Sequence, residues 1–244
     1  MIMYDVYGKI VTEISDATLV AGRANTQKFA EPFIIQDIIA KLELNSTDHV
    51  LEIGCAMGTL LFPLSFVVNK MYGIDHPNIV GKLKEIPSQN QCEFHGGNWL
   101  TDTFDLPSNI NKIIIYSVLQ YMRSFEELMV FTNKALNSIP SGGKILIGDI
   151  PNSDRRRFFN ASPRGKQFHE AWEKTRHESK TDEEKRRDEI FKDNKVEGLI
   201  DFNDDLIFEF MRTLRKEGHE VYLLPQPNHL PFGNTREDIL IIKY

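Results

Sequence analysis

The sequence predicts one α/β domain on a seven-stranded, mostly parallel sheet whose last strand is antiparallel, with helices on both faces. Strand-like and helix-like segments alternate five times between residues 49 and 150. This alternation is typical of parallel strands joined by crossover helices. A further helix over 203–218 is followed by two strand-like segments with only a loop between them. Strands joined in this way pair antiparallel, so the final strand is expected to run against the others.

Each element is predicted from its own pattern. The strands are short apolar runs, and the helices carry apolar residues at helical spacing. Ser124 and Glu127 form a capping box at one helix start, and Pro63 is tolerated only in a first turn. The predicted strands are 49–55, 70–76, 92–99, 111–119, 142–150, 220–226 and 237–244. The predicted helices are 26–44 (with Thr26 as cap), 58–68, 78–86, 124–139 and 203–218.

Two segments lie outside the alternation. Residues 1–47 are expected to form an N-terminal helical cap, and residues 152–202 a helical insertion or lid. The insertion mixes charges of both signs with few apolar positions, which is typical of an exposed helix. No internal repeat or low-complexity linker divides the chain, so residues 1–244 are predicted to be one domain.

Composition narrows the class of protein. The chain has 244 residues, of which 41% are hydrophobic and 26% charged, which is enough to bury a sizeable core. Its net charge of −6 argues against a nucleic-acid partner, which needs a basic surface. The two cysteines are too few for a disulfide framework, and every apolar stretch is shorter than the ~18 residues of a membrane span. A cytoplasmic protein without a membrane span is expected, and the oligomeric state is left open.

The stretch LEIGCAMGTL, residues 51–60, places a carboxylate inside an apolar strand and two glycines in the turn that follows. In a doubly wound sheet, ligands bind beyond the carboxyl ends of the strands next to strand one. Gly54 and Gly58 would let the backbone turn tightly and approach a ligand. Asp75 ends the next strand, where a carboxylate can accept both hydroxyls of a ribose. Together these residues predict a site for a nucleotide-like cofactor.

This region resembles class I S-adenosylmethionine (SAM)-dependent methyltransferases. Their first motif is an acid, an apolar residue and Gly-x-Gly-x-Gly, and it is matched from Glu52 to Gly58 with Ala56 in place of the middle glycine. The resemblance covers residues 48–150 by motif and 203–244 by topology. It implies a Rossmann-like fold, SAM as cofactor and an enzyme that transfers a methyl group.

The resemblance also implies which residues bind the cofactor. The motif loop takes the methionine part of SAM, Asp75 takes the ribose, and Asn98 and Trp99 fall where the family contacts adenine. Arg23 is expected to reach the SAM carboxylate, and Cys55 to be a small buried residue. The implied cofactor-binding residues are Glu52, Gly54, Cys55, Ala56, Gly58, Asp75, His76, Asn98, Trp99 and Ser117.

Methyl transfer needs an aligned nucleophile, exclusion of water and sometimes a base. Asp149, which ends the fifth strand, and His229, between the last two strands, are the candidate catalytic bases. The plainer interpretations are a loop-capping aspartate and an exposed loop histidine. Gln120 and Tyr121 close the fourth strand, where the family faces its substrate, although Tyr121 fits core packing equally well.

The segment DRRRFFNASPRGK holds five basic residues against one acid. Arg155 and Arg156 are therefore candidates to bind an anionic substrate, since arginine binds phosphate in a bidentate manner. A solvated basic loop is the alternative. The expected partner is a small-molecule substrate, such as an anionic sugar or nucleotide sugar. No metal is predicted, although Asp149, Asn152 and Asp154 could supply oxygen ligands.

A narrower resemblance rests on GDIPNSDRRRFF and VYLLPQPNHLPFGNTREDILI. These stretches look like bacterial methyltransferases associated with surface-polysaccharide biosynthesis, which implies O- or N-methylation of a sugar or glycan precursor. Two alternatives stay open: a non-catalytic SAM-fold subunit and a nicotinamide-dependent oxidoreductase. The retained Asp75 and glycines count against the first. The missing Gly-x-Gly-x-x-Gly spacing and the reversed last strand count against the second.

Overall fold

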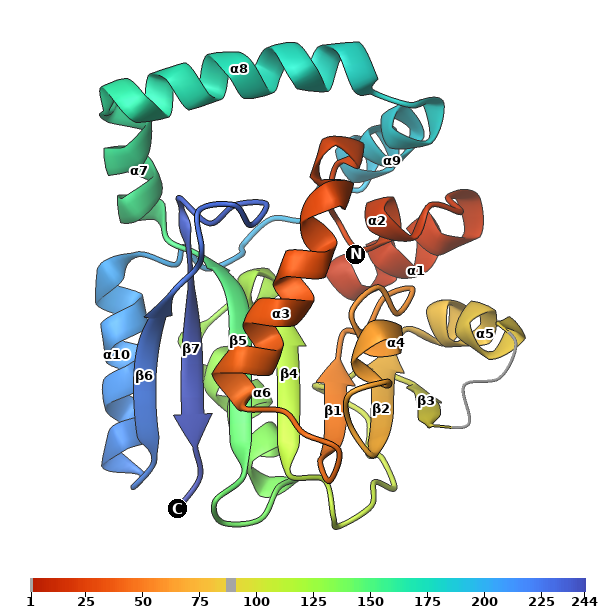
Figure 1. Cartoon of the computed structure of the whole chain (residues 1–244), viewed down its shortest axis with the longest axis vertical. Coiled ribbons are helices and arrows are strands. Elements are labelled where there is room, and N and C mark those ends of the chain that lie inside the picture. Colours follow the sequence, from red (N-terminus) through yellow and green to blue (C-terminus); the bar gives the residue numbers. More distant parts are fainter. Residues whose placement is uncertain (1, 87–90) are drawn as a thin grey trace.

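The computed structural model describes residues 2–86 and 91–244, without the side chains of 176–179, and contains a seven-stranded sheet (Figure 1). The strand order is β3-β2-β1-β4-β5-β7-β6. The first five strands pair in parallel, and β7 runs antiparallel to both of its neighbours. The predicted fold class is thus confirmed. The strands are β1 (His49–Ile53), β2 (Lys70–Asp75), β3 (Cys92–Gly96), β4 (Lys112–Tyr116), β5 (Lys144–Pro151), β6 (Glu220–Pro225) and β7 (Arg236–Ile242).

Helices cover both faces of the sheet because its central strands are apolar on both sides. In β4, Ile113 and Ile115 belong to one core layer and Ile114 to the other. The first layer packs under α6 (Phe125–Asn137) and α10 (Asp204–Lys216). The second packs under α1 (Met3–Glu13), α2 (Ala17–Val20), α3 (Glu31–Leu42), α4 (Leu61–Leu64) and α5 (Pro77–Glu85). No helix of residues 2–86 and 91–244 combines the length and apolarity needed to cross a membrane.

Two predicted helices differ from the structure. The segment predicted over 26–44 divides into a 3₁₀ helix, η1 (Asn25–Ala30), and α3, which has Pro32 in its first turn. Thr26 does not cap it; instead the Ala24 N–H donates to Gln27 Oε1 at 2.8 Å. The helix predicted over 58–68 is the single turn α4, which contains Pro63. Proline has no N–H to donate and is tolerated only where a helix begins, so a short helix is consistent with this residue.

Three helices between β5 and α10 arch over the carboxyl ends of the strands (Figure 1). They are α7 (Ser153–Ala161), α8 (Pro163–Ser179) and α9 (Asp182–Asp193). The short helix η2 (Leu119–Tyr121) follows β4. Helix α9 packs on α1 and α2. That residues 1–47 act as a cap and residues 152–202 as a lid remains a prediction.

The junction between α9 and the N-terminal helices is polar and partly buried. Arg187 is 5% exposed, and its guanidinium donates to the Arg23 carbonyl and lies 3.8 Å from the buried Glu184 carboxylate. Glu183 Oε1 accepts from the N–H and hydroxyl of Ser15 at 3.0 and 2.8 Å. These bonds fasten the insertion to the loop that joins α1 and α2 and to the segment after α2.

We expect Arg187→Met to lower the free energy of unfolding by about 3–5 kcal/mol, because it leaves the Glu184 carboxylate buried without its cation. Arg186→Met is the matched control on the same helix. The Arg186 side chain is 46% exposed and pairs with Glu13 and Glu189 at the surface, so its loss should cost less than about 1 kcal/mol. Urea unfolding of both variants measures the difference, and equal effects would contradict this account of the junction.

Candidate active site

The carboxyl ends of β1, β2 and β4 meet where the strand order reverses, because β2 and β3 extend to one side of β1 while β4 and β5 extend to the other. A cavity opens there, as expected for this topology. The volume of the cavity, including the space at its open mouth, is about 1120 Å³. The predicted cofactor residues that line it are Glu52, Gly54, Cys55, Ala56, Asp75, Asn98, Trp99 and Ser117.

The loop after β1 turns sharply through three residues with left-handed backbone. Gly54, Ala56 and Gly58 have φ values of 82°, 43° and 74°. A Cβ on Gly54 would lie 2.5 Å from Val118 Cγ2, so a side chain there would collide with the segment after β4. Ala56 holds a conformation that costs an ordinary residue roughly 1–2 kcal/mol. The loop therefore keeps the geometry of a triple-glycine motif even though its middle residue is alanine.

Asp75 closes this loop from the end of β2. Its Oδ2 accepts the Ala56 N–H at 2.7 Å, and its Oδ1 accepts the His76 N–H at 2.6 Å. Burial raises the pKa of Asp75 to about 6, although these two N–H donors oppose the rise. A carboxylate has about four acceptor positions, so Asp75 can still accept hydroxyl donors from a ligand.

Glu52 is the carboxylate that the sequence places inside an apolar strand. It is 2% exposed, lines the cavity, and its Oε2 has no hydrogen-bond partner among the described residues. Burial raises its pKa to about 8; the nearby Arg23 lowers the pKa, and Asp75 raises it further. Such a group can receive a cationic or N–H-bearing part of a ligand.

A second cavity of about 560 Å³ adjoins the first. Its lining includes Gln120 and Asp149, with Arg236 and Phe232 from the chain around the start of β7. Both cavities share the residues Ala21, Arg23, Tyr116, Ser117 and Tyr121, so these residues lie between them.

Asp149 faces this second cavity and is hydrogen-bonded to Ser117, which lines both cavities. The Ser117 hydroxyl donates to Asp149 Oδ2 at 2.6 Å, and Arg236 Nε lies 3.8 Å from Asp149 Oδ1. Both Ser117 and Asp149 have left-handed backbone, with φ values of 60° and 61°. Strained residues of this kind cluster at functional sites. The candidate base is thus linked through one hydroxyl to the space between the cavities.

Sequence reasoning missed Tyr7, which α1 brings to the first cavity. The hydroxyls of Tyr7 and Tyr121 are 2.7 Å apart, and burial raises the pKa of Tyr7 well above its usual value. Arg236 was also missed as a lining residue. Neither residue belongs to a local motif, because each reaches the site only through tertiary packing.

Two predicted cofactor residues lie beside the first cavity. A Cβ on Gly58 would meet the Phe62 ring at 2.6 Å, so this glycine permits the turn into α4. His76 Nδ1 accepts the Asn78 N–H at 3.1 Å at the start of α5, and burial lowers the pKa of His76. Trp99, which does line the cavity, also donates from Nε1 to the Phe131 carbonyl at 3.1 Å. These three residues support the local structure.

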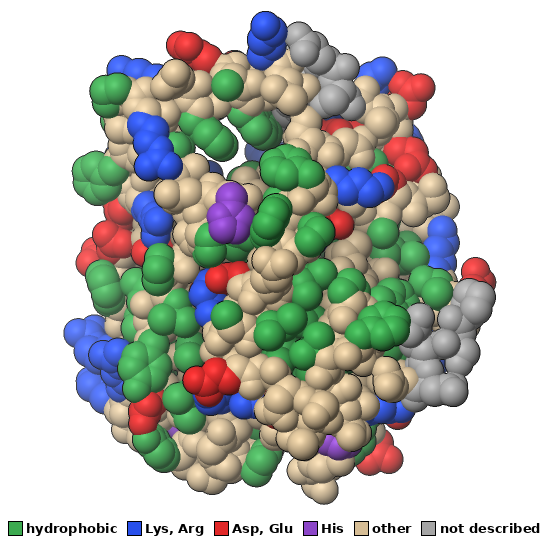
Figure 2. All heavy atoms as spheres, viewed as in Figure 1, with side chains coloured by type: hydrophobic (Ala, Val, Ile, Leu, Met, Phe, Trp, Pro, Cys, Tyr) green, Lys and Arg blue, Asp and Glu red, His purple; other side chains and the backbone are tan. Residues whose placement is uncertain are grey.

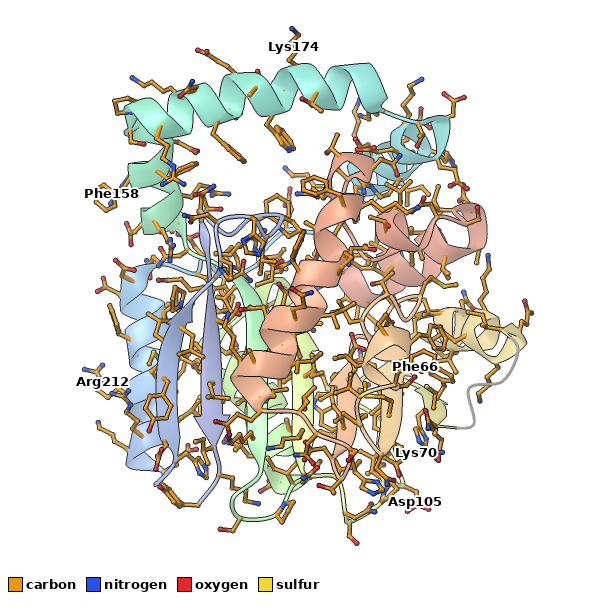
Figure 3. The ribbon with its side chains drawn as sticks, viewed as in Figure 1. Phe66, Lys70, Asp105, Phe158, Lys174 and Arg212 are labelled. Atoms are coloured by element: carbon orange, nitrogen blue, oxygen red, sulfur yellow. The ribbon has the colours of Figure 1, made fainter. Side chains whose placement is uncertain are left out.

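The remaining predicted residues are outside the linings of both cavities. His229 is exposed, with its ring 4.9 Å from that of Phe33. Arg155 pairs with Glu237 at 3.1 Å and donates to the Asn234 carbonyl at 3.1 Å. Arg156 is exposed on α7. Figure 3 shows the neighbouring Phe158 on the outer side of that helix.

The possible oxygen ligands after β5 have other partners. Asn152 Nδ2 donates to Asp204 and Glu237 at 2.7 Å each. Asp154 pairs with Arg157 at 2.7 Å. Across the described residues, no group of three or more His, Cys, Asp or Glu side chains could hold a metal ion.

No family model matches the chain. The chain is 39% identical over 61 residues to the 23S rRNA (uracil(1939)-C(5))-methyltransferase RlmD of Pasteurella multocida (strain Pm70), a match that spans 25% of this chain and 14% of RlmD. A second match, 27% identical over 118 residues, covers 47% of the chain and 2% of a probable non-canonical nonribosomal peptide synthetase, CymA, of Salinispora arenicola (strain CNS-205). The chain therefore spans a small part of the curated relatives it matches.

Several solved structures that align with most of this chain are methyltransferases. The N-methyltransferase NodS from Bradyrhizobium japonicum WM9, in complex with S-adenosyl-L-homocysteine (SAH), aligns with a TM-score of 0.57 at 14% identity, over 97% of this chain and 96% of NodS. Phosphoethanolamine N-methyltransferase 1 from Haemonchus contortus aligns with a TM-score of 0.66 at 14% identity, over 98% and 47%. The mitomycin 7-O-methyltransferase MmcR aligns with a TM-score of 0.60 at 13% identity, over 98% of this chain and 60% of MmcR. The chain has the Rossmann-like fold of these methyltransferases.

We expect Glu52→Gln to flatten the pH dependence of stability without added ligand. The folded pKa near 8 exceeds the unfolded value of 4.5, so the folded protein holds the proton more tightly. Stability from this group is complete below pH 4.5 and is lost as the pH rises through 8, by up to about 1.4 kcal/mol per unit. Urea unfolding between pH 5 and 8 measures this effect. The free energy of unfolding of the variant, relative to that of the wild type, should increase as the pH rises. A constant difference across that range would contradict the assignment.

Proposed function

We propose that the protein is a SAM-dependent methyltransferase that binds SAM in the cavity beyond β1, β2 and β4. The observation that carries the proposal is the coincidence, in one cavity, of the left-handed loop from Gly54 to Gly58, the Asp75 carboxyl and the unpartnered Glu52 carboxyl. The fold shared with SAH-bound NodS supports it. When bound, SAM supplies an electrophilic sulfonium methyl.

In this proposal each residue has a physical role. Backbone groups of the loop after β1 bind the methionine part of SAM, and Asp75 accepts from the ribose hydroxyls. Glu52 and Arg23 supply a carboxyl and a guanidinium near each other, which suits the ammonium and carboxylate of an amino acid. Asn98 and the Trp99 backbone flank the position expected for adenine.

The adjoining cavity would hold a small-molecule methyl acceptor. It combines polar groups, such as Gln120 and Asp149, with an apolar wall that includes Ile34 and Phe232. Figure 2 shows an opening beneath α8, at the end of the molecule where this cavity lies. Arg236 offers a cation for an anionic acceptor and lines this cavity, whereas Arg155 and Arg156 do not.

For an alcohol acceptor, Asp149 would take the proton as the methyl group is transferred. The Asp149 carboxylate accepts a hydrogen bond from Ser117, which lines both cavities, and the Tyr7 and Tyr121 hydroxyls are paired with each other at the first cavity. Methylation of a sugar or glycan precursor at oxygen or nitrogen remains our proposed reaction. The free thiols of Cys55 and Cys92 support the proposed cytoplasmic location, where thiols stay reduced.

Binding calorimetry with SAM, SAH and nicotinamide adenine dinucleotide tests the cofactor. We expect Asp75→Ala to weaken SAM binding at least about tenfold, because it removes charge-assisted hydrogen bonds worth ~1.5–3 kcal/mol each. Asp105→Ala is the control, since Asp105 is an exposed aspartate at the opposite end of the molecule (Figure 3). Binding of the dinucleotide in place of SAM would favour an oxidoreductase. Unchanged SAM affinity in Asp75→Ala would reject the ribose assignment.

We expect Asp149→Asn to keep SAM affinity and to slow methyl transfer to an alcohol by about 10²–10⁴-fold, because shape is retained and basicity is lost. His229→Gln should have little effect, since His229 is exposed and outside both cavity linings. Mass spectrometry of sugars, nucleotide sugars and amines incubated with methyl-labelled SAM identifies the acceptor and then measures both variants. The reverse pattern would assign the role of base to His229. SAM binding without transfer to any acceptor would favour a non-catalytic subunit.

A further inference from the structure

Strand β5 contains an irregularity at Asp149. Its pairing with β7 runs regularly to Ile147 opposite Ile239 and resumes at Ile150 opposite Glu237. Two residues of β5, Gly148 and Asp149, therefore face the single residue Asp238 of β7. This is a β-bulge, and bulges beside active sites redirect a side chain. The left-handed φ of 61° at Asp149 belongs to this bulge.

Side chains of β7 replace the ladder hydrogen bonds that Asp149 has lost. Asp238 Oδ1 accepts the Asp149 N–H at 2.9 Å, in a buried position. Arg236 Nη1 donates to the Asp149 carbonyl at 3.2 Å and to Gln120 Oε1 at 3.0 Å. Both main-chain groups of Asp149 are thus held by β7, and its carboxylate is left for Ser117 and the second cavity.

Asp238 is itself held by a buried ion triad, which joins it to Lys41 and Asp37 of α3. Lys41 Nζ lies 2.7 Å from Asp238 Oδ2 and 2.5 Å from Asp37 Oδ2. The Asp238 side chain is fully buried, and the other two are 12% and 11% exposed. Gln226 Nε2 donates to the same Asp238 Oδ1 that receives the Asp149 N–H, at 2.8 Å.

Such a triad is a poor way to gain stability. Buried ions lose their hydration, and well-packed apolar residues in their place are often neutral or stabilising. The triad has one feature that an apolar cluster could not supply, which is a fixed acceptor aimed at the Asp149 N–H. Lys41 pairs with Asp238 Oδ2, so the buried carboxylate that supplies this acceptor is not left as an unpaired charge.

We propose that Asp238 is a positioning residue whose side-chain acceptor for the Asp149 N–H holds the bulge that presents Asp149 to the methyl acceptor, while Lys41 and Asp37 balance the charge of its buried carboxylate. The catalytic meaning rests on the proposed function. The role of Asp238 in holding the backbone of Asp149 does not rest on it, because crystal structures of the variants show that backbone without any methyl acceptor.

Two triple variants separate the hydrogen-bond acceptor from the charges. D37N/K41M/D238L removes every charge of the triad together with the acceptor for the Asp149 N–H. D37N/K41M/D238N removes the same charges but keeps a side-chain carbonyl at position 238. E43Q/K144M is the matched control, since Lys144 of β5 pairs with Glu43 at the end of α3 without touching Asp149. Crystal structures with SAH, SAH affinities and turnover with the acceptor found by mass spectrometry are the readouts.

We expect D37N/K41M/D238L to fold, to bind SAH within about twofold of the wild type, and to lose both the left-handed φ at Asp149 and the bond to Ser117. Its kcat should fall by about 10²-fold with KM little changed, because a displacement near 1 Å is enough for such a loss. D37N/K41M/D238N should keep the bulge and most of the turnover, and E43Q/K144M should match the wild type. If D238L prevents folding, D238A in the same background takes its place.

An Asp149 that keeps its conformation and its Ser117 bond in D37N/K41M/D238L would overturn the proposal. Equal displacement of Asp149 in both triple variants would overturn it too, since the acceptor would then be irrelevant. Failure of the wild type to bind SAH faults the proposed function instead, and the φ of Asp149 in the variants still decides the role of Asp238.

Discussion

The antiparallel pairing of β7 with β5 is the constraint on which the geometry of the candidate site depends. A parallel strand in that place would need a crossover connection, and its carboxyl end would lie at the cavities. Because β7 is reversed, its first residues lie there instead, and Arg236 and Asp238 reach the main chain of Asp149. The feature that distinguishes this sheet from an ordinary dinucleotide-binding one therefore also orients the candidate base.

A second constraint is the left-handed backbone where three strands end. Gly54 follows β1, Ser117 follows β4, and Asp149 lies near the end of β5. Gly54 and Ser117 turn the chain abruptly, so that residues beyond them line the first cavity. At Asp149 the strand continues to Pro151, and Asp149 itself lines the second cavity. For Ser117 and Asp149 this conformation costs roughly 1–2 kcal/mol each, a strain that persists only because neighbouring bonds over-determine it. The hydrogen bond between their side chains is one of those bonds.

The sheet, its reversed strand and the loop after β1 could be predicted from the sequence, because each depends on local periodicity or on a short motif. It predicted Asp149 from its place at a strand end, and the structure puts Asp149 at the second cavity. Tyr7 lies in no motif, and the stretch 221–241 that contains Asp238 carried only the narrower resemblance, so neither residue could be placed at the site from the sequence. The basic segment 154–166 was over-interpreted for a related reason. Composition suggests that Arg155 can bind an anionic substrate, but it does not reveal that Arg155 already pairs with Glu237 and donates to the Asn234 carbonyl.

The insertion after β5 connects to the site through the backbone. Of the described residues, none between 152 and 202 lines either cavity. Arg187 of α9 instead donates to the carbonyl of Arg23, a residue that lines both cavities. Arg23 Nη1 is in turn 3.3 Å from Thr59 Oγ1, just beyond the loop after β1. The hydrogen bond from α9 therefore holds the main chain of a residue that lines both cavities, while the guanidinium of that residue is held by Glu31 and Thr59.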